Sequence, residues 1–267
     1  ITNCNVTGWA RYTIFSWGTS GSENNNITVS NNYIYDNFTS DSQSSFSIIF
    51  DGNTTNSTIT GNSFYETTGT IVPTPTIEHY QFIRIFNFKG GNVGDGFTIT
   101  NNYMGGTAPE CGGSSINIGL TSSQNIDFVG IRLSVGTTNA TSVQGNVLKN
   151  INFKSACTAA IPFYGMYITN GVVNVGDITG NIIGSNTGTG SIEVTSTLNS
   201  STYGILVSSA SNINISNNTI ASFTTSTSDP TLRNNFHGIY KTAVAGNFTA
   251  YNNTIGSLTQ ANSVNAS

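Results

Sequence analysis

The sequence is poor in charge. Asp, Glu, Lys and Arg make up 7% of the 267 residues, and the formal net charge is −4. So few basic residues give no positive field that would attract nucleic acid or anionic lipid, and neither partner is expected. The apolar runs fall short of the roughly 18 residues of a membrane span, and the first residues lack the pattern of a signal peptide. Membrane insertion is therefore not expected.

Residues that carry catalysis or bind metals are scarce and scattered. The twelve Asp and Glu residues include no pair two positions apart on an expected strand, as paired carboxylates or calcium ligands would require. The two histidines, His79 and His237, lie far apart, and neither has a serine or cysteine in a matching register of the repeat described below. We therefore expect no metal and no cofactor, and these residues predict no catalytic centre.

Turn-forming and hydroxyl residues are abundant instead, with 37 Asn, 72 Ser and Thr, and 29 Gly. Disordered chains are usually highly charged, whereas 36% of this chain is apolar. The apolar residues also recur at regular intervals. This combination predicts an ordered repeat fold.

A six-residue motif recurs eight times. It reads apolar, usually Ser or Thr, Asn or Gly, Asn, any residue, apolar. Its copies begin at Ile1, Val29, Ile59, Ile99, Val143, Ile178, Ile215 and Ala250. A second short, alternating stretch precedes most copies, at residues 12–15, 46–49, 82–85, 129–133, 164–168, 203–207 and 237–240. Each unit is thus expected to contribute two short strands and a looser third stretch, with no helices.

The residue types of the motif have physical reasons. The third position is always Asn or Gly, which most readily adopt the left-handed conformation, so the chain is expected to bend there between two strands. The fourth position is Asn in seven copies. Stacked about 4.8 Å apart, these side chains would form a hydrogen-bonded amide ladder. The expected ladder consists of Asn32, Asn62, Asn102, Asn146, Asn181, Asn218 and Asn253.

The motif and its asparagine column resemble the repeat of pectate-lyase-like right-handed parallel β-helix proteins, over nearly the whole chain. The resemblance implies an all-β, right-handed parallel β-helix of about eight coils, with three parallel sheets per coil. Residues 1–267 would form a single domain. The family includes polysaccharide lyases and hydrolases as well as long bacterial surface proteins, so the fold does not choose between these functions.

One outward column of the second strands is a candidate functional surface. Arg84 and Arg132 occupy the same position in their strands, and the column continues through Phe15, Tyr167 and Tyr240. In the lyase branch of the family a basic residue abstracts a proton beside calcium-bound carboxylates, so the arginines suggest a carbohydrate-active enzyme as an alternative. The aromatic residues favour a contact strip, with carbohydrate as one candidate partner.

A second outward array carries hydroxyl groups on three consecutive coils. It consists of Thr28, Ser30, Thr58, Thr60, Thr98 and Thr100, and the column is expected to continue through Ser142 and Asp177. Such arrays resemble the ice-binding faces of some β-solenoids. Because Thr is also common on exposed strands, ice or glycan binding is kept as an alternative.

The ends of the repeat show no polar capping segment, although soluble solenoids normally need caps to shield their terminal coils. We therefore expect the coils to continue in flanking chain or to stack on other copies of the chain. The residue usage is familiar in exported repeat proteins. The sequence thus predicts a non-catalytic structural or adhesive segment of an extracellular, cell-surface protein such as a stalk or filament.

Three cysteines cannot all pair within one chain. Cys4 replaces the ladder asparagine in the first motif, so a buried free thiol is expected. Cys111 and Cys157 follow the motifs at Ile99 and Val143 at similar distances, in adjacent coils. Because coils stack about 4.8 Å apart, within the Cα separation of a disulfide, the spacing predicts a Cys111–Cys157 bridge. The alternative is two independent thiols in loops.

Overall fold

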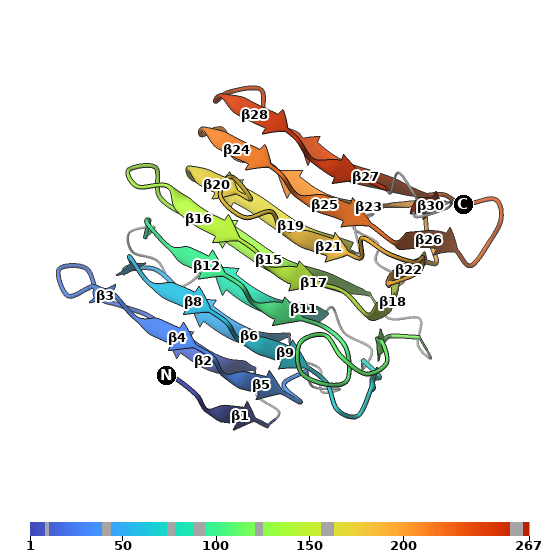
Figure 1. Ribbon diagram of the computed structural model, residues 1–267, viewed down its shortest axis with the longest axis horizontal. Coiled ribbons are helices and arrows are strands. Elements are labelled where there is room, and N and C mark those ends of the chain that lie inside the picture. Colours follow the sequence, from blue (N-terminus) through green and yellow to red (C-terminus); the bar gives the residue numbers. More distant parts are fainter. Residues whose placement is uncertain are drawn as a thin grey trace.

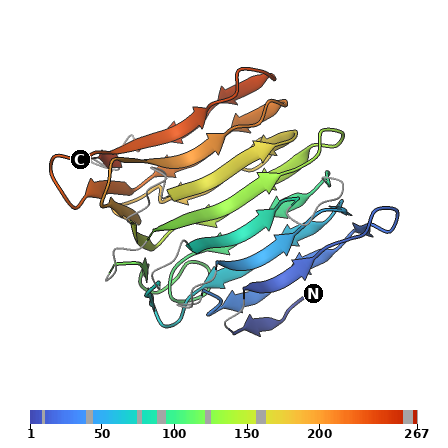
Figure 2. The same cartoon turned by 180° about the vertical axis from the view of Figure 1, so that it is seen from behind.

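The computed structural model describes residues 1–8, 11–38, 44–73, 78–87, 94–120, 125–155, 163–256 and 264–266. These residues form strands, turns and loops, and none of them is helical. Coils stack on one another in chain order from the N-terminal to the C-terminal end (Figures 1 and 2). Strands pair in parallel with equivalent strands of the neighbouring coils. The predicted all-β parallel β-helix of about eight coils is confirmed.

The strands belong to four long sheets. Sheet 1 contains β4 (Thr28–Ser30), β8 (Thr58–Thr60), β12 (Thr98–Thr100), β16 (Thr141–Gln144), β20 (Val173–Val175), β24 (Ile213–Ser216) and β28 (Phe248–Tyr251). Sheet 2 contains β1 (Asn5–Thr7), β5 (Tyr33–Tyr35), β9 (Ser63–Tyr65), β13 (Tyr103–Met104), β17 (Val147–Leu148), β21 (Ile182–Gly184), β25 (Thr219–Ala221) and β29 (Thr254–Ile255).

The remaining sides of the coil complete the architecture. Sheet 3 contains β10 (Thr70–Ile71), β14 (Ile116–Ile118), β18 (Ile151–Ser155), β22 (Ile192–Ser196), β26 (Phe223–Thr227) and β30 (Val264–Ala266). Sheet 4 contains β2 (Tyr12–Ser16), β6 (Ser45–Phe50), β11 (Glu78–Ile85), β15 (Ile126–Ser134), β19 (Phe163–Asn170), β23 (Ser200–Val207) and β27 (Asn234–Lys241). β3 (Asn24–Asn25) and β7 (Thr54–Thr55) pair only with each other. The expected looser third stretch is therefore a regular sheet, sheet 3.

The motif bends at its third residue, as predicted. The φ angle there is 54° at Asn31, 65° at Gly61, 55° at Asn101 and 62° at Gly145. Only Gly, Asn and Asp tolerate this left-handed conformation at low cost. Six of the eight motifs therefore supply one strand to sheet 1 and one to sheet 2, whereas the first motif supplies only β1 and the sixth only β21.

The fourth motif residue forms a buried amide ladder, which confirms the prediction from the sequence. Each of the first six side chains donates from Nδ2 to Oδ1 of the ladder residue in the next coil, over 2.8–3.0 Å. Oδ1 of Asn102 also accepts the backbone N–H of Asn62 at 3.0 Å. The second Nδ2 hydrogen of Asn102 goes to the carbonyl of Ile59 at 2.9 Å. An inner ladder asparagine thus uses both donors and both acceptor sites, which no other side chain of this size matches.

The core is a stack of aliphatic and aromatic side chains from all four sheets. Space is tight where sheet 4 faces sheet 2. A side chain at Gly204 would lie 2.6 Å from Ile220 and 2.5 Å from the carbonyl of Gly238. Glycine at this position therefore reflects a close approach of packed residues.

The prediction of Ile178 as the buried first residue of the sixth motif is wrong. Ile178 is 80% exposed, and Val175 occupies the buried position, where it pairs with Val143. The extra residues form a bulge that the side chain of Gln144 holds. Its Nε2 donates to Asp177 Oδ1 at 2.6 Å, and its Oε1 accepts the N–H of Ile178 at 3.1 Å.

Candidate functional site

The outward column predicted on sheet 4 is aligned by the strand register. Neighbouring strands place Phe15, Ile49, Arg84, Arg132, Tyr167, Leu206 and Tyr240 in one row. A second row beside it contains Tyr12, Phe46, Gln81, Val129, Tyr164, Tyr203 and His237. Phe15 and Tyr240, near the two ends, are 42% and 43% exposed, whereas Ile49, Arg84 and Leu206 are buried.

Aromatic rings and guanidinium groups of the two rows, together with Phe86 directly after β11, form a continuous stack, which we call the outer strip. It consists of Tyr12, Phe15, Phe46, Arg84, Phe86, Arg132, Tyr164, Tyr167, Tyr203, His237 and Tyr240. Ring centroids in contact lie 4.8–6.0 Å apart. The guanidinium carbons lie 4.6–5.3 Å from the centroids of the rings they cover. The outer strip crosses all seven strands of sheet 4.

A pocket of about 150 Å³ opens beside the N-terminal half of the outer strip. It is lined by Arg11, Tyr12, Phe15, Ser44, Phe46, Ile49, Asp51, His79, Arg84 and Arg132. Three of the four arginines of the whole chain therefore meet at this one place. The Nε of Arg132 is buried and has no hydrogen-bond partner among the described residues. The pocket is thus a concentration of positive charge on an otherwise weakly charged protein.

Burial and neighbouring groups act on the charge of Arg84 in this pocket. Burial, and next the neighbouring Arg132 guanidinium, lower the pKa of Arg84 to about 10, while Asp51, Tyr12 and Asp127 act in the opposite direction. Arg84 therefore stays protonated at neutral pH, at an energetic cost that a bound anion would offset. Two carboxylates, Asp51 and Asp127, lie close enough to Arg84 to act on its charge. A carbohydrate-active enzyme of the kind considered above would need carboxylates beside its basic residue.

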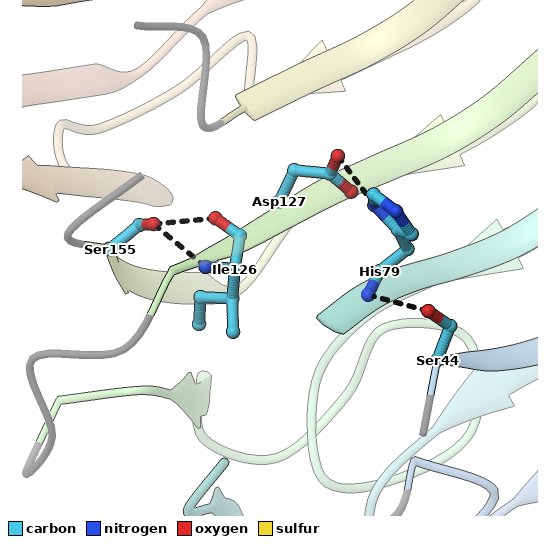
Figure 3. A network of polar contacts seen from close by, with 5 residues as sticks. All are labelled: Ser44, His79, Ile126, Asp127 and Ser155. Atoms are coloured by element: carbon cyan, nitrogen blue, oxygen red, sulfur yellow. Dashed lines mark hydrogen bonds and ion pairs between the residues drawn. The ribbon is translucent and has the colours of Figure 1, made fainter. Parts of the chain in front are cut away.

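His79 and Asp127 form a pair that the sequence reading missed. They are register partners on β11 and β15, and His79 Nδ1 lies 2.7 Å from Asp127 Oδ2 (Figure 3). Ser44 lies on the other side of His79, where its Oγ accepts the backbone N–H of His79 at 3.1 Å. The expectation that His79 has no serine in a matching register is therefore wrong. The sequence alone does not show that these residues are neighbours, because Ser44 and Asp127 lie 35 and 48 residues from His79 in the chain.

The hydroxyl array on sheet 1 is in register over its first three coils. Thr28, Thr58 and Thr98 align in one row, and Ser30, Thr60 and Thr100 in the next. Two of these hydroxyls bind each other, because Thr60 Oγ1 lies 2.8 Å from Thr100 Oγ1. The expected continuation from Ser142 to Asp177 is wrong, since Asn174 pairs with Ser142. The array is therefore shorter than the outer strip.

The expectation that the Cys4 thiol is buried is wrong. This thiol is free but exposed, because no coil covers the outer side of the first coil. Cys111 is 1% exposed, and its burial raises the pKa of its thiol to about 12. It precedes β14 of sheet 3, whereas residue 157 follows β18 of the same sheet. Cys157 lies outside the described residues, so the Cys111–Cys157 disulfide stays a prediction.

Among the described residues, no group of three or more His, Cys, Asp or Glu side chains has the geometry to hold a metal ion. None of the described residues belongs to a helix that would span a membrane.

No protein-family model matches the chain, and neither the curated proteins nor the solved structures contain a significant match. The resemblance to pectate-lyase-like proteins therefore rests on the motif alone. The residues of the outer strip are the remaining indication of function.

Proposed function

We propose that the chain is a structural or adhesive β-helix segment of an extracellular protein, and that it binds carbohydrate along the outer strip. The observation that carries this proposal is the unbroken stack of rings and guanidinium groups across sheet 4. Aromatic faces pack against the apolar faces of sugar rings, and neighbouring polar groups fix their orientation. Seven strands about 4.8 Å apart give the outer strip a length of about 29 Å, which suits an oligosaccharide.

The charge of the pocket favours an acidic saccharide at the N-terminal half of the outer strip. Arginine presents several donors in a planar fork and pairs well with carboxylate and sulfate oxygens. Arg84 and Arg132 adjoin in the row, and Arg11 lines the same pocket. A carboxylate or sulfate seated there would relieve the repulsion between the guanidinium groups. A sugar-binding role also agrees with the exposure of Phe15 and Tyr240.

Substitutions on the outer strip are expected to weaken binding of an acidic oligosaccharide. For a hexamer of uronic acid, Arg132→Gln and Tyr167→Ala should each raise Kd at least about tenfold, since each removes one charged or stacking contact. Isothermal titration calorimetry measures the effect, and its dependence on salt separates the two contributions. Arg233→Gln and Tyr33→Ala are matched controls outside the outer strip. Equal losses in the controls, or no binding by the parent chain, would contradict the proposal.

The ends of the stack support the structural part of the proposal. At the first coil a hollow of about 440 Å³ is lined by Ile14 and Val29 of the core and by Ile1, which is 56% exposed. At the last coil Tyr251 and Ile255 are 47% and 53% exposed. We propose that further coils, from flanking chain or from a second copy, cover these ends.

Self-association of the isolated chain is therefore expected to depend on its end coils. Ile255→Lys should shift the sedimentation profile towards the monomer, because a charge cannot be buried cheaply between coils. Ile178→Lys, at an isoleucine that is 80% exposed in a bulge away from the ends, is the matched control. A parent chain that stays monomeric at every concentration would count against end-to-end stacking.

A further inference from the structure

His79 and Asp127 are arranged so that His79 can act as a general base. Asp127 carries no hydrogen when ionised, so His79 Nδ1 donates to it across 2.7 Å and the lone pair of the imidazole is at Nε2. The carboxylate holds the ring in this tautomer and stabilises the imidazolium that forms when Nε2 takes a proton. The two side chains are 39% and 21% exposed, so His79 is accessible.

The surroundings of His79 fit a reaction in which negative charge develops. His79 lines the same pocket as Arg84 and Arg132, whose charges would stabilise an oxyanion. Tyr12 and Phe46 give the pocket an apolar wall, and its volume of about 150 Å³ suits a small acyl group.

The available groups favour ester hydrolysis over cleavage of a glycosidic bond. Glycoside hydrolysis commonly uses one carboxylic acid and one carboxylate on opposite sides of the bond. Asp127 is engaged by His79, and Oδ1 of Asp51 accepts the backbone N–H of Gly52 at 2.7 Å. Ester hydrolysis needs only a base, a water molecule and a cation for the oxyanion.

We propose that His79, positioned by Asp127, activates water to hydrolyse an ester group, such as an acetyl group, on a saccharide held by the outer strip; this inference rests on the proposed carbohydrate binding. Nε2 takes a proton from water as the water oxygen attacks the ester carbonyl carbon. The resulting oxyanion faces Arg84 and Arg132. The carbon–oxygen bond to the sugar then breaks, and the imidazolium returns the proton to the leaving sugar oxygen. Ester and water thus give carboxylic acid and alcohol.

Water, and not Ser44, is the nucleophile in this scheme. Oγ of Ser44 accepts the backbone N–H of His79, and no hydrogen bond joins it to the imidazole ring. Diisopropyl fluorophosphate, which labels nucleophilic serines, should therefore leave hydrolysis unchanged. A labelled Ser44 with loss of activity would overturn the proposed mechanism.

Hydrolysis of p-nitrophenyl acetate and of partially acetylated alginate by the full chain tests the inference. His79→Ala should lower kcat at least about 100-fold on both, and added imidazole should restore release of acetate from the alginate. Asp127→Asn places an amide donor against Nδ1 and so moves the ring hydrogen to Nε2. It should lower kcat about 100-fold and leave KM unchanged.

Asp229→Asn, an exposed acid-to-amide change in the turn between β26 and β27 and outside the pocket, is the matched control and should keep the parent's rate. Parent-like rates in His79→Ala, or no rescue by imidazole, would overturn the inference. A parent chain that binds alginate without hydrolysing either ester would overturn the inference and leave the proposed function standing. Hydrolysis of p-nitrophenyl acetate without any binding of alginate would overturn the proposed function and, with it, the saccharide substrate of the inference, and would leave the general-base role of His79 standing.

Discussion

Replacing Asn102 by alanine should lower the free energy of unfolding by about 4 kcal/mol. The substitution leaves the backbone N–H and Nδ2 of Asn62 without their acceptor, and the carbonyl of Ile59 without its donor. These groups are buried, and an unsatisfied buried polar group costs about 1–3 kcal/mol. The loss also interrupts the ladder, whose hydrogen bonds reinforce one another along the stack.

Urea titration monitored by circular dichroism measures the difference. Asn5→Ala, at an exposed asparagine of the first coil, is the control and should change stability by less than about 0.5 kcal/mol. If Asn102→Ala costs no more than the control, the amide ladder does not hold the coils together.

Glu66 should make stability fall as pH rises from about 4.5 to 8. Its side chain is 2% exposed, and burial is the main reason why its pKa rises to about 8, although the backbone N–H groups of Phe38 and Asn37 oppose the rise. In this range the folded chain keeps a proton that the unfolded chain has released. The folded state thus binds more protons, and stability decreases with pH.

Glu66→Gln keeps an oxygen that accepts the same two N–H groups, at 3.0 Å each in the parent, and removes the ionisation. At pH 8.5 the variant should be more stable than the parent by up to about 5 kcal/mol, and at pH 4 the two should be nearly equal. Urea titrations at pH 4, 6 and 8.5 measure this difference. Glu23→Gln, at an exposed acid, should follow the parent, and parallel profiles for Glu66→Gln and the parent would refute the explanation.

The fold was predictable because the same local requirement repeats in every coil. Few residue types fit a left-handed bend, as at Asn31 or Asn101, or the ladder position that follows it. Eight weak motifs together therefore specify a β-helix. The row that contains Arg84 and Arg132 follows from the same register.

Positions fixed by contacts between coils were not predictable from the motif. The sequence around Ile178 fits the motif, yet the pairing of Val175 with Val143 places Ile178 in an exposed bulge. The connecting segments differ in length, so the alignment of His79 with Asp127 depends on the strand pairing of β11 with β15. Sheet 3 was predicted only as a looser third stretch, because its strands lie in the connecting segments and share no repeated motif.

Chemical-shift mapping of the isotopically labelled chain with a uronic acid hexamer locates the bound saccharide on the protein. The shifts should concentrate on the outer strip, above all at Phe15, Arg132, Tyr167 and Tyr240, and Arg132→Gln should abolish those at the pocket. Shifts confined to the hydroxyl array of Thr58 and Thr98 on sheet 1, or no shifts at saturating saccharide, would contradict it.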